Sequence, residues 1–482
     1  MKNTEVIISD LFGNLFSRNK LLSLFTILIV TGLLFTLNLK GAIIVSSIPL
    51  VFIIIFNVFN SPIRILFLAL SFSFVISGLS RYIKFSWGLG IDIFLVLGWI
   101  ILFFREYKNL NLNHLKNDFF GLSLFWMSYV VFLIINPESH SLEAWFYAMR
   151  GVGFYFLLVL GLGLMTLRHY NHLDNFLNTI ILLSVLGSIW AIKQKYIGID
   201  SFEYKWLWVD GHYDEHVLFG VLRAFSFYSD AGQFGASQIM ISMICAILIL
   251  QKKLSLSKRT FYLIGFILTF IGFALSGSRG PMIIPVIGGF TFLILSKNFK
   301  LLILGLTVLA SSFIVLKYTY VAHSIEQVRR FRTALAPDNP SLNARLRNQK
   351  IFAEHLKSRP LGGGIGSAGY WGNRFSPNTL LASTPTDSYY VKVWAETGII
   401  GVSLHSLILG YLMGRCVCII NTIRNINLKF KALALFSAVF GVLVASYGNQ
   451  IFSQLPTGII MAMSIGLLYL MPIYDRQLFT KT

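Results

Sequence analysis

The feature that constrains this chain most is a series of apolar runs, each about as long as a helix that crosses a lipid bilayer. A soluble protein has no core that could bury so many apolar residues, so the bilayer must be the solvent for most of the chain. We therefore predict an all-α, polytopic transmembrane helical bundle of about 12–14 helices. The predicted spans are residues 21–39, 42–59, 62–80, 88–104, 119–135, 151–167, 176–193, 233–250, 260–277, 281–296, 301–317, 397–414, 431–448 and 455–474.

Composition agrees with this class. Of the 482 residues, 55% are apolar and only 12% are charged, whereas a soluble chain carries about 25% charged residues. The net charge of +20 would point to nucleic acid in a soluble protein. Here the basic residues fall at helix ends and in loops, so we expect membrane lipid head groups and phosphate-bearing substrates as partners, and no nucleic acid.

The distribution of Lys and Arg predicts the orientation of the spans. With the N-terminus placed inside, the short cytoplasmic segments hold 20 of these residues and the short outer loops hold 5. Short loops rich in Lys and Arg stay in the cytoplasm. We therefore expect both termini in the cytoplasm.

This orientation divides the chain into five parts. We expect a cytoplasmic amphipathic segment at 1–20, a transmembrane bundle at 21–317 with an outer loop at 194–232, and C-terminal transmembrane helices at 397–474. A large outer, periplasmic loop at 318–396 separates the eleventh and twelfth spans. Residues 475–482 form a cytoplasmic tail. Within the large loop, apolar spacing predicts an amphipathic helix at 341–358, which Pro360 would end.

Four polar clusters fall on the predicted outer face. Each joins charged residues to Gly, Ser or Pro at the mouth of a span or inside an outer loop. They are Arg223-Ala-Phe-Ser-Phe-Tyr-Ser-Asp-Ala-Gly-Gln-Phe-Gly, Ser276-Gly-Ser-Arg-Gly-Pro281, the stretch from Arg345 to Arg359-Pro-Leu-Gly-Gly-Gly-Ile-Gly366, and Asp387-Ser-Tyr-Tyr-Val-Lys-Val-Trp-Ala-Glu396-Thr-Gly-Ile-Ile-Gly401.

In this order and spacing, the clusters resemble the O-antigen ligase and O-antigen polymerase superfamily, whose members are bacterial membrane glycosyltransferases. The resemblance covers residues 223–401. It implies a donor glycan on undecaprenyl diphosphate, an acceptor hydroxyl outside the cytoplasmic membrane, and a metal-independent, inverting reaction without a cofactor. Ligases transfer the glycan to lipid A-core, and polymerases transfer it to another lipid-linked repeat unit. Other polysaccharide-assembly proteins, such as a chain-length regulator, are further partners that the resemblance allows.

One position departs from the ligase pattern. Ligases of the superfamily carry a His nine residues before the Glu of a Glu-x-Gly-x-x-Gly stretch, and this chain has Asp387 there. The departure favours a polymerase of O-antigen or of a related surface polysaccharide. A ligase is the first alternative. A transporter or flippase of the lipid-linked oligosaccharide is the second, but transporters tend to place charged residues at the bilayer midplane, and here the charges gather at one face.

Two arginines are candidates for stabilising the leaving diphosphate. Arg279 precedes Pro281, a residue suited to the first turn of a helix, so the free N–H groups of that helix would point at the same site. Arg223 precedes a Gly-spaced stretch that enters the eighth span. The alternatives are an Arg279 that reaches toward lipid head groups and an Arg223 that forms a salt bridge with a nearby acid.

Asp387 is the candidate catalytic base, because a carboxylate within hydrogen-bond reach of a hydroxyl can take its proton. The alternative is an N-cap for the helix that enters the twelfth span, a position where Asp is common. We expect substrate contacts from Arg345, Arg359, Tyr390 and Glu396. For the neighbouring Arg347 and Lys350, a solvated helix face is the favoured interpretation.

We predict no metal ligand. His212, Asp214 and His216 are close in sequence, but two His and one acid without a further partner are a weak metal signal. The Gly-rich stretch 362–366 lacks the Gly-Lys-Ser/Thr of a nucleotide loop. We interpret it as a tight turn that brings backbone close to a ligand.

The orientation can be tested by labelling. A cysteine at position 341 should react with a membrane-impermeant maleimide in intact cells, because the loop 318–396 is predicted outside. Absence of labelling, together with reaction after permeabilisation, would overturn the orientation.

Overall fold

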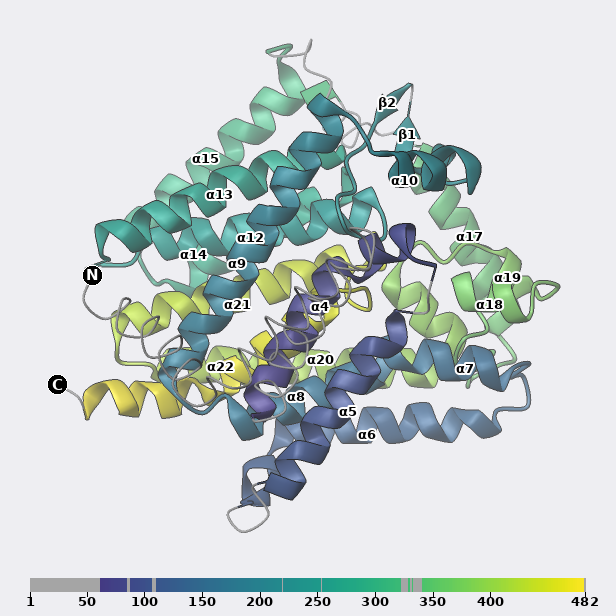
Figure 1. The fold of residues 1–482 in the computed structure, drawn as a ribbon, viewed down its shortest axis with the longest axis horizontal. Coiled ribbons are helices and arrows are strands. Elements are labelled where there is room, and N and C mark those ends of the chain that lie inside the picture. Colours follow the sequence, from purple (N-terminus) through teal and green to yellow (C-terminus); the bar gives the residue numbers. More distant parts are fainter. Residues whose placement is uncertain are drawn as a thin grey trace, which may run out of the picture.

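The computed structural model describes residues 61–84, 87–105, 110–218, 220–252, 254–321, 328–329, 332 and 340–480. The predicted segment 1–20 and the predicted spans 21–39 and 42–59 lie outside the described residues. Figure 1 shows a bundle in which helices of different tilt cross one another. Within the described part of the chain the only strands are the short antiparallel pair β1 (Val217–Leu218) and β2 (Val221–Leu222).

Nine of the described helical runs are long and apolar enough to cross a membrane. Three shorter apolar helices accompany them. This confirms the prediction of an all-α, polytopic membrane protein. The nine are α4 (Pro62–Tyr82), α6 (Asp118–Phe132) with the 3₁₀ turn η2 (Leu133–Ile135), α7 (Leu142–Met149) continuing through the π turn η3 (Arg150–Phe154) into α8 (Tyr155–Thr166), α9 (Tyr170–Ile192) with the π turn η4 (Lys193–Ile197), α12 (Ala231–Ile249), α13 (Leu256–Ser276), α20 (Tyr389–Thr422), α21 (Ile426–Ala445) and α22 (Thr457–Phe479).

The remaining elements lie between the spans or beside them. They are the apolar helices α5 (Gly88–Arg105), α14 (Ile283–Leu295) and α15 (Phe299–Tyr318), the turns η1 (Leu112–Leu115), η5 (Lys205–Val209) and η6 (Gly280–Met282), and the helices α10 (Ser201–Tyr204), α11 (Tyr213–His216), α17 (Pro340–Leu356), α18 (Gly369–Phe375) and α19 (Leu380–Ser383).

The most buried spans are α12, α21 and α22. Helix α12 packs against α13, α9, α14 and α21, while α22 packs against α8, α20 and α21. Helix α15 packs mainly on α14 and exposes apolar side chains such as Ile303, Leu304 and Phe313, as a lipid-facing helix does. The C-terminal end of α22 lies at the opposite end of the bundle from α10, α17, α18 and α19 (Figure 1).

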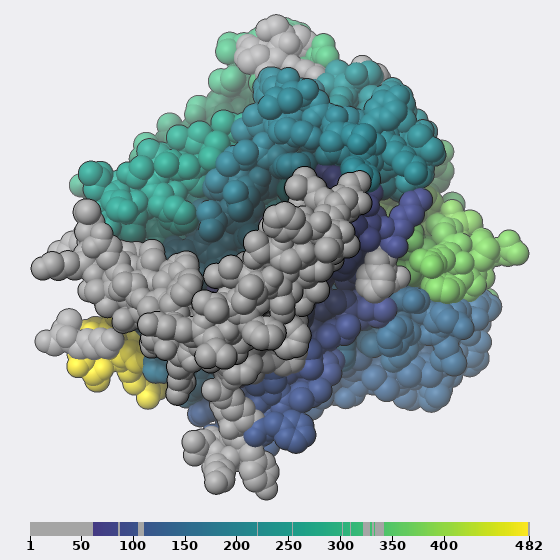
Figure 2. Space-filling view, in the orientation of Figure 1, coloured from purple at the N-terminus to yellow at the C-terminus, as the bar shows by residue number. Residues whose placement is uncertain are grey.

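The long loop between α15 and α20 has a small core of its own. Phe352 and Leu356 of α17 pack with Ala368, Leu381 and Val391. Helix α18 leans on α7, where the rings of Tyr147 and Trp371 stack 4.6 Å apart. Figure 2 shows this green part of the chain beside the blue part that holds α6 and α7. The predicted amphipathic helix at 341–358 is therefore present as α17.

Each predicted span beyond residue 61 falls on a helix, with two corrections. Arg150, expected in a short outer loop, lies inside the continuous helical run Leu142–Thr166. It is 7% exposed, and its guanidinium forms an ion pair with Asp92 of α5 (2.9 Å). The second correction concerns α20, which begins at Tyr389 and not at 397, so its first turns take the end of the predicted loop 318–396.

Helix α20 is kinked at Gly398, and the Gly-rich turn 360–366 packs against this kink. Gly398 has φ 66° and ψ −171°, and Ile400 N donates to Pro360 O (3.3 Å) across the break. Gly363 N donates to Ala395 O (2.9 Å). On the other side, Nδ2 of Asn136 donates to the carbonyls of residues 361 and 362 (both 3.1 Å). The turn 360–366 thus packs against the protein interior, and its contact with a ligand stays a prediction.

Replacing Gly398 should destabilise the protein. A Cβ at this position would lie 2.0 Å from Pro360 O, and the positive φ disfavours any L side chain. We expect Gly398→Ala to lose about 1–3 kcal/mol from backbone strain alone. The measurement is thermal unfolding in detergent. Gly410→Ala is the matched control, since it lies on the same helix with no atom within 4 Å of its Cβ position and should leave the melting temperature unchanged or slightly higher.

Candidate functional site

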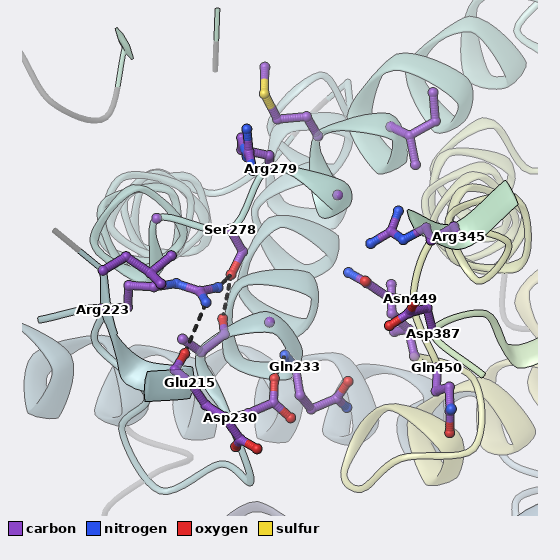
Figure 3. A pocket seen from close by; sticks show the side chains of 18 of the residues that line it. Glu215, Arg223, Asp230, Gln233, Ser278, Arg279, Arg345, Asp387, Asn449 and Gln450 are labelled. Carbon is purple, nitrogen blue, oxygen red and sulfur yellow. Dashed lines mark hydrogen bonds between the residues drawn. The ribbon is translucent and has the colours of Figure 1, made fainter. Parts of the chain in front are cut away.

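A large cavity lies between the loops at one end of the bundle (Figure 3). Its volume is about 1220 Å³, above the range of about 300–1,000 Å³ that is usual for small-molecule sites. Its lining includes Arg223, Arg279, Arg345 and Asp387. Four residues predicted from separate clusters therefore share one cavity. The lining is drawn from residues 214–218, 223, 230–233, 277–286, 312–316, 342–345, 370, 387 and 449–454.

Arg223 is held by three hydrogen bonds at the end of β2. Its Nε donates to Ser276 O (3.1 Å), its Nη1 to Glu215 O (3.2 Å) and its Nη2 to Ser278 Oγ (2.7 Å). Ser278 Oγ in turn donates to Ala231 O (2.8 Å). The guanidinium thus joins the ends of α11, α13 and α12, and its face is fixed toward the cavity.

Arg279 directly precedes the helical turn that leads into α14. Pro281 occupies the first turn of η6, as predicted, and α14 continues from Ile283. Free N–H groups at such a helix start favour an anion. Arg279 and the N-terminal end of this helix therefore offer positive charge to the same part of the cavity.

Arg345 and Asp387 lie on the opposite wall. Arg345 belongs to α17, and its Nη1 would be 3.7 Å from a Cβ placed on Gly448. Asp387 is an exposed residue with φ 26°, just before α20. Within the part of the chain that the structure describes, neither side chain makes a hydrogen bond or an ion pair. Both are available to a ligand.

The capping alternative for Asp387 is wrong. The N-cap of α20 is the next residue, Ser388, whose Oγ accepts a hydrogen bond from Val391 N. A left-handed backbone at Asp387 takes its side chain away from the first turn of the helix. The carboxylate has no structural task at the helix start and points into the cavity with Asn449 and Gln450 (Figure 3).

Amide side chains complete the polar wall. Asn449, Gln450 and Gln454 come from the short connection between α21 and α22, and Gln233 comes from α12. Gln450 Nε2 donates to Thr386 Oγ1 (2.7 Å), next to Asp387. Sequence reasoning missed these residues. The signal was present as three amides in six residues between two apolar spans, but this connection holds no charged residue, whereas each of the four predicted clusters does.

One wall of the cavity is apolar. Helix α14 contributes Ile283 and Val286, α15 contributes Phe313 and Leu316, and α17 contributes Leu342. These side chains share the cavity with the arginines and amides. A ligand with an anionic, polar head and an apolar tail would match both kinds of lining.

Residues 264–406 match the model of a protein family described as O-Antigen ligase. This stretch of the chain is similar to that family, and the match confirms the resemblance to the O-antigen ligase and polymerase superfamily. The matched residues include Arg279, Arg345 and Asp387, whereas Arg223 and the amides after α21 lie outside them. No curated protein matches the chain.

Three predicted binding residues, Arg359, Glu396 and Tyr390, do not line the main cavity. Arg359 forms an ion pair with Glu138 (3.0 Å) and donates to His355 O (2.8 Å). Glu396 is fully buried, near the N–H groups of residues 366 and 368, and within the described chain its carboxylate makes no well-formed hydrogen bond. Their binding roles stay predictions, and the site described here does not need them.

Tyr390 faces a second, apolar groove of about 770 Å³ between α14, α20 and α21. Its hydroxyl donates to Leu443 O (2.9 Å), so the polar end of the ring is already satisfied. The groove shares one face of α14 with the main cavity, since Phe290 and Ile294 continue the row begun by Ile283 and Val286.

The residues of the weak metal pattern have other tasks. His216 Nδ1 donates to His212 O (3.0 Å), and its ring packs against Trp206 and Phe225. Burial lowers the pKa of His216 to about 4, so it is neutral at physiological pH. Among the described residues, no three His, Cys, Asp or Glu side chains gather as a metal site would require.

Proposed function

We propose that the chain is a membrane glycosyltransferase that joins undecaprenyl-diphosphate-linked oligosaccharide repeat units into O-antigen or a related surface polysaccharide. One observation carries the proposal. Arg223, Arg279, Arg345 and Asp387 share a cavity that is also lined by apolar side chains of α14, α15 and α17. Arginines suit a diphosphate, and an apolar wall suits the first isoprene units of its carrier.

In the proposed reaction, the hydroxyl of the acceptor sugar attacks the anomeric carbon of the donor glycan. The new carbon–oxygen bond forms as the bond from that carbon to the diphosphate oxygen breaks. The hydroxyl proton passes to the carboxylate of Asp387. The electron pair leaves with undecaprenyl diphosphate, whose charge Arg223 and Arg279 offset. A single displacement of this kind inverts the anomeric configuration.

The placement of the cavity supports an outer-face reaction in the bacterial inner membrane. The C-terminal end of α22, predicted in the cytoplasm, lies at the far end of the bundle from α17 and α18 (Figure 1). Asp387, found where ligases carry His, favours the polymerase over the ligase. The glycan ladder in a deletion strain separates the rivals: one attached unit left means polymerase, no attached glycan means ligase, and accumulation of repeat units facing the cytoplasm means flippase.

The arginine roles predict large losses of rate. Arg223→Ala and Arg279→Ala should each lower polymer formation about 10²–10³-fold, as the loss of one donor to a developing anion does. Lys should rescue poorly, because it lacks the two-pronged geometry of guanidinium. The assay follows polymer made from purified lipid-linked repeat units in detergent.

The matched control is Arg347→Ala. Arg347 is exposed on α17, two residues from Arg345, and is absent from the cavity lining. It should keep full activity. Equal losses in all three variants, or full-length polymer from both Arg223→Ala and Arg279→Ala, would place the diphosphate elsewhere.

The role of Asp387 predicts a different pattern. Asp387→Asn should lower kcat strongly at normal stability, because Ser388 and not Asp387 caps α20. Ser388→Ala should do the reverse, losing about 1 kcal/mol of stability while its folded fraction stays active. Near-normal turnover of Asp387→Asn would remove this residue from the mechanism. The assay is run with a chelator, and loss of wild-type activity under that condition would refute the metal-independent scheme.

A further inference from the structure

The segment 223–230 has no regular secondary structure. It joins β2 to α12, and both of its ends, Arg223 and Asp230, line the cavity. Ser226 in its middle has φ 51°, a left-handed conformation that a residue other than glycine adopts only when its surroundings enforce it.

Helix α4 supplies partners for three successive carbonyls of this segment. Arg81 Nη1 donates to Ser226 O (2.6 Å), Gly78 N donates to Phe227 O (2.8 Å), and Arg81 Nη2 donates to Tyr228 O. A buried carbonyl without a partner is costly. The Arg81 side chain therefore binds the carbonyls on both sides of Phe227, whose own carbonyl is bonded by the backbone of α4.

Aromatic rings fix the plane of the Arg81 guanidinium. Its central carbon lies 4.2 Å from the ring centroid of Trp206 and 4.4 Å from that of Phe225. Only 9% of Arg81 is exposed. Lysine cannot replace a planar guanidinium that lies against two rings and donates to two carbonyls.

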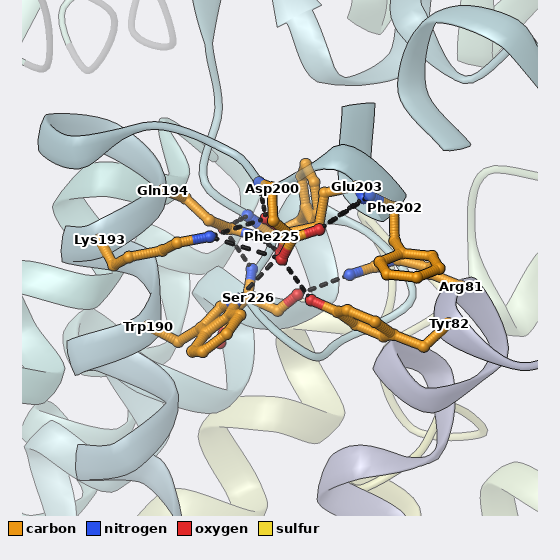
Figure 4. A network of polar contacts seen from close by, with 10 residues as sticks. All are labelled: Arg81, Tyr82, Trp190, Lys193, Gln194, Asp200, Phe202, Glu203, Phe225 and Ser226. Atoms are coloured by element: carbon orange, nitrogen blue, oxygen red, sulfur yellow. Dashed lines mark hydrogen bonds and ion pairs between the residues drawn. The ribbon is translucent and has the colours of Figure 1, made fainter. Parts of the chain in front are cut away.

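Gln194 holds the same segment from the opposite side. Its Oε1 accepts from Phe225 N (3.2 Å) and Ser226 N (2.8 Å), while its Nε2 donates to Glu203 (2.6 Å). Ser226 Oγ donates to Gly187 O (2.7 Å). Figure 4 shows Arg81 and Gln194 reaching the segment from α4 and from the end of α9. The segment is thus bonded along its length before either end reaches the cavity.

We propose that Arg81 is a positioning residue for the cavity. By holding residues 226–228 in place, it determines the positions of Arg223 and Asp230, although it does not line the cavity itself. This inference rests on the proposed function only for the role of Arg223 as a diphosphate ligand. A displacement of about 1 Å in such a ligand can lower turnover about 10²-fold.

The test has one arm that needs no activity. Hydrogen–deuterium exchange of peptides covering 223–230 should become about tenfold faster or more in Arg81→Lys, because its amides lose their shared restraint. Arg81→Gln decides the outcome if Arg81→Lys does not fold. Gln194→Met is the positive control, because it removes the acceptor of two amides of this segment. The control is Arg150→Lys, which removes another buried, ring-stacked guanidinium (Arg150 lies over Tyr147) and should leave this exchange unchanged.

The second arm is a double-mutant cycle on polymer formation. Arg81→Lys alone should lower turnover about 10–100-fold. In an Arg223→Ala background it should cost less than about threefold, since residues that act through one another are not additive. For the control pair, the fold-losses of turnover in Arg150→Lys and Arg223→Ala should multiply in the double variant.

The two arms separate the possible failures. Unchanged exchange in the folded Arg81 variant overturns the inference, and so does a fully multiplicative cycle. If the wild-type protein makes no polymer but the exchange responds as expected, the proposed function fails and the positioning of 223–230 by Arg81 stands.

Discussion

The side chains of Arg81, Gln194 and Asn136 bond to backbone that has left the helices. In a bilayer, every N–H and C=O group must find a partner inside the protein. Arg81 and Gln194 satisfy the segment 223–230, and Asn136 satisfies the Gly-rich turn beside Gly398. Irregular chain can therefore enter the helical bundle at this end, and a cavity with polar walls becomes possible there.

The cavity combines two kinds of surface that a bilayer normally keeps apart. Arg223, Arg279 and Arg345 line the same cavity as apolar residues of α14 and α15. The charge of Arg223 is not left alone, because its guanidinium donates to the carbonyls of Ser276 and Glu215. In the proposed reaction this arrangement would meet a charged diphosphate and an isoprene chain at once. Asp387, with no partner among the described residues, would lie beside the hydroxyl of the acceptor sugar.

The sequence predicted what depends on hydropathy and on helix-end chemistry. The spans from residue 62 onward, α17, and Pro281 in the turn after Arg279 all follow from local patterns. The three arginines and Asp387 were expected to lie close together, because all four were predicted on the outer face. Ser388 as the cap of α20 was missed, because two adjacent polar residues compete for that position and the backbone of Asp387 decides between them.

Other features could not be predicted, since their partners carry no sequence signal. Arg81 bonds to main-chain carbonyls more than 140 residues away along the chain, and any residue could supply those. Arg150 was placed in a loop because its partner Asp92 lies on a different helix. The amides after α21 escaped notice because they are uncharged and the connection that holds them is short.

The length of α20 has a consequence for where substrates meet. Its 34 residues extend about 51 Å at 1.5 Å per residue, against about 30 Å of hydrocarbon in a bilayer. The part after Gly398 is by itself long enough to cross. Once that part fills the hydrocarbon, the turns before the kink rise to the depth of the lipid phosphates. A carrier anchored in one leaflet could then present its diphosphate there without leaving the membrane, while a sugar arrives from the water above.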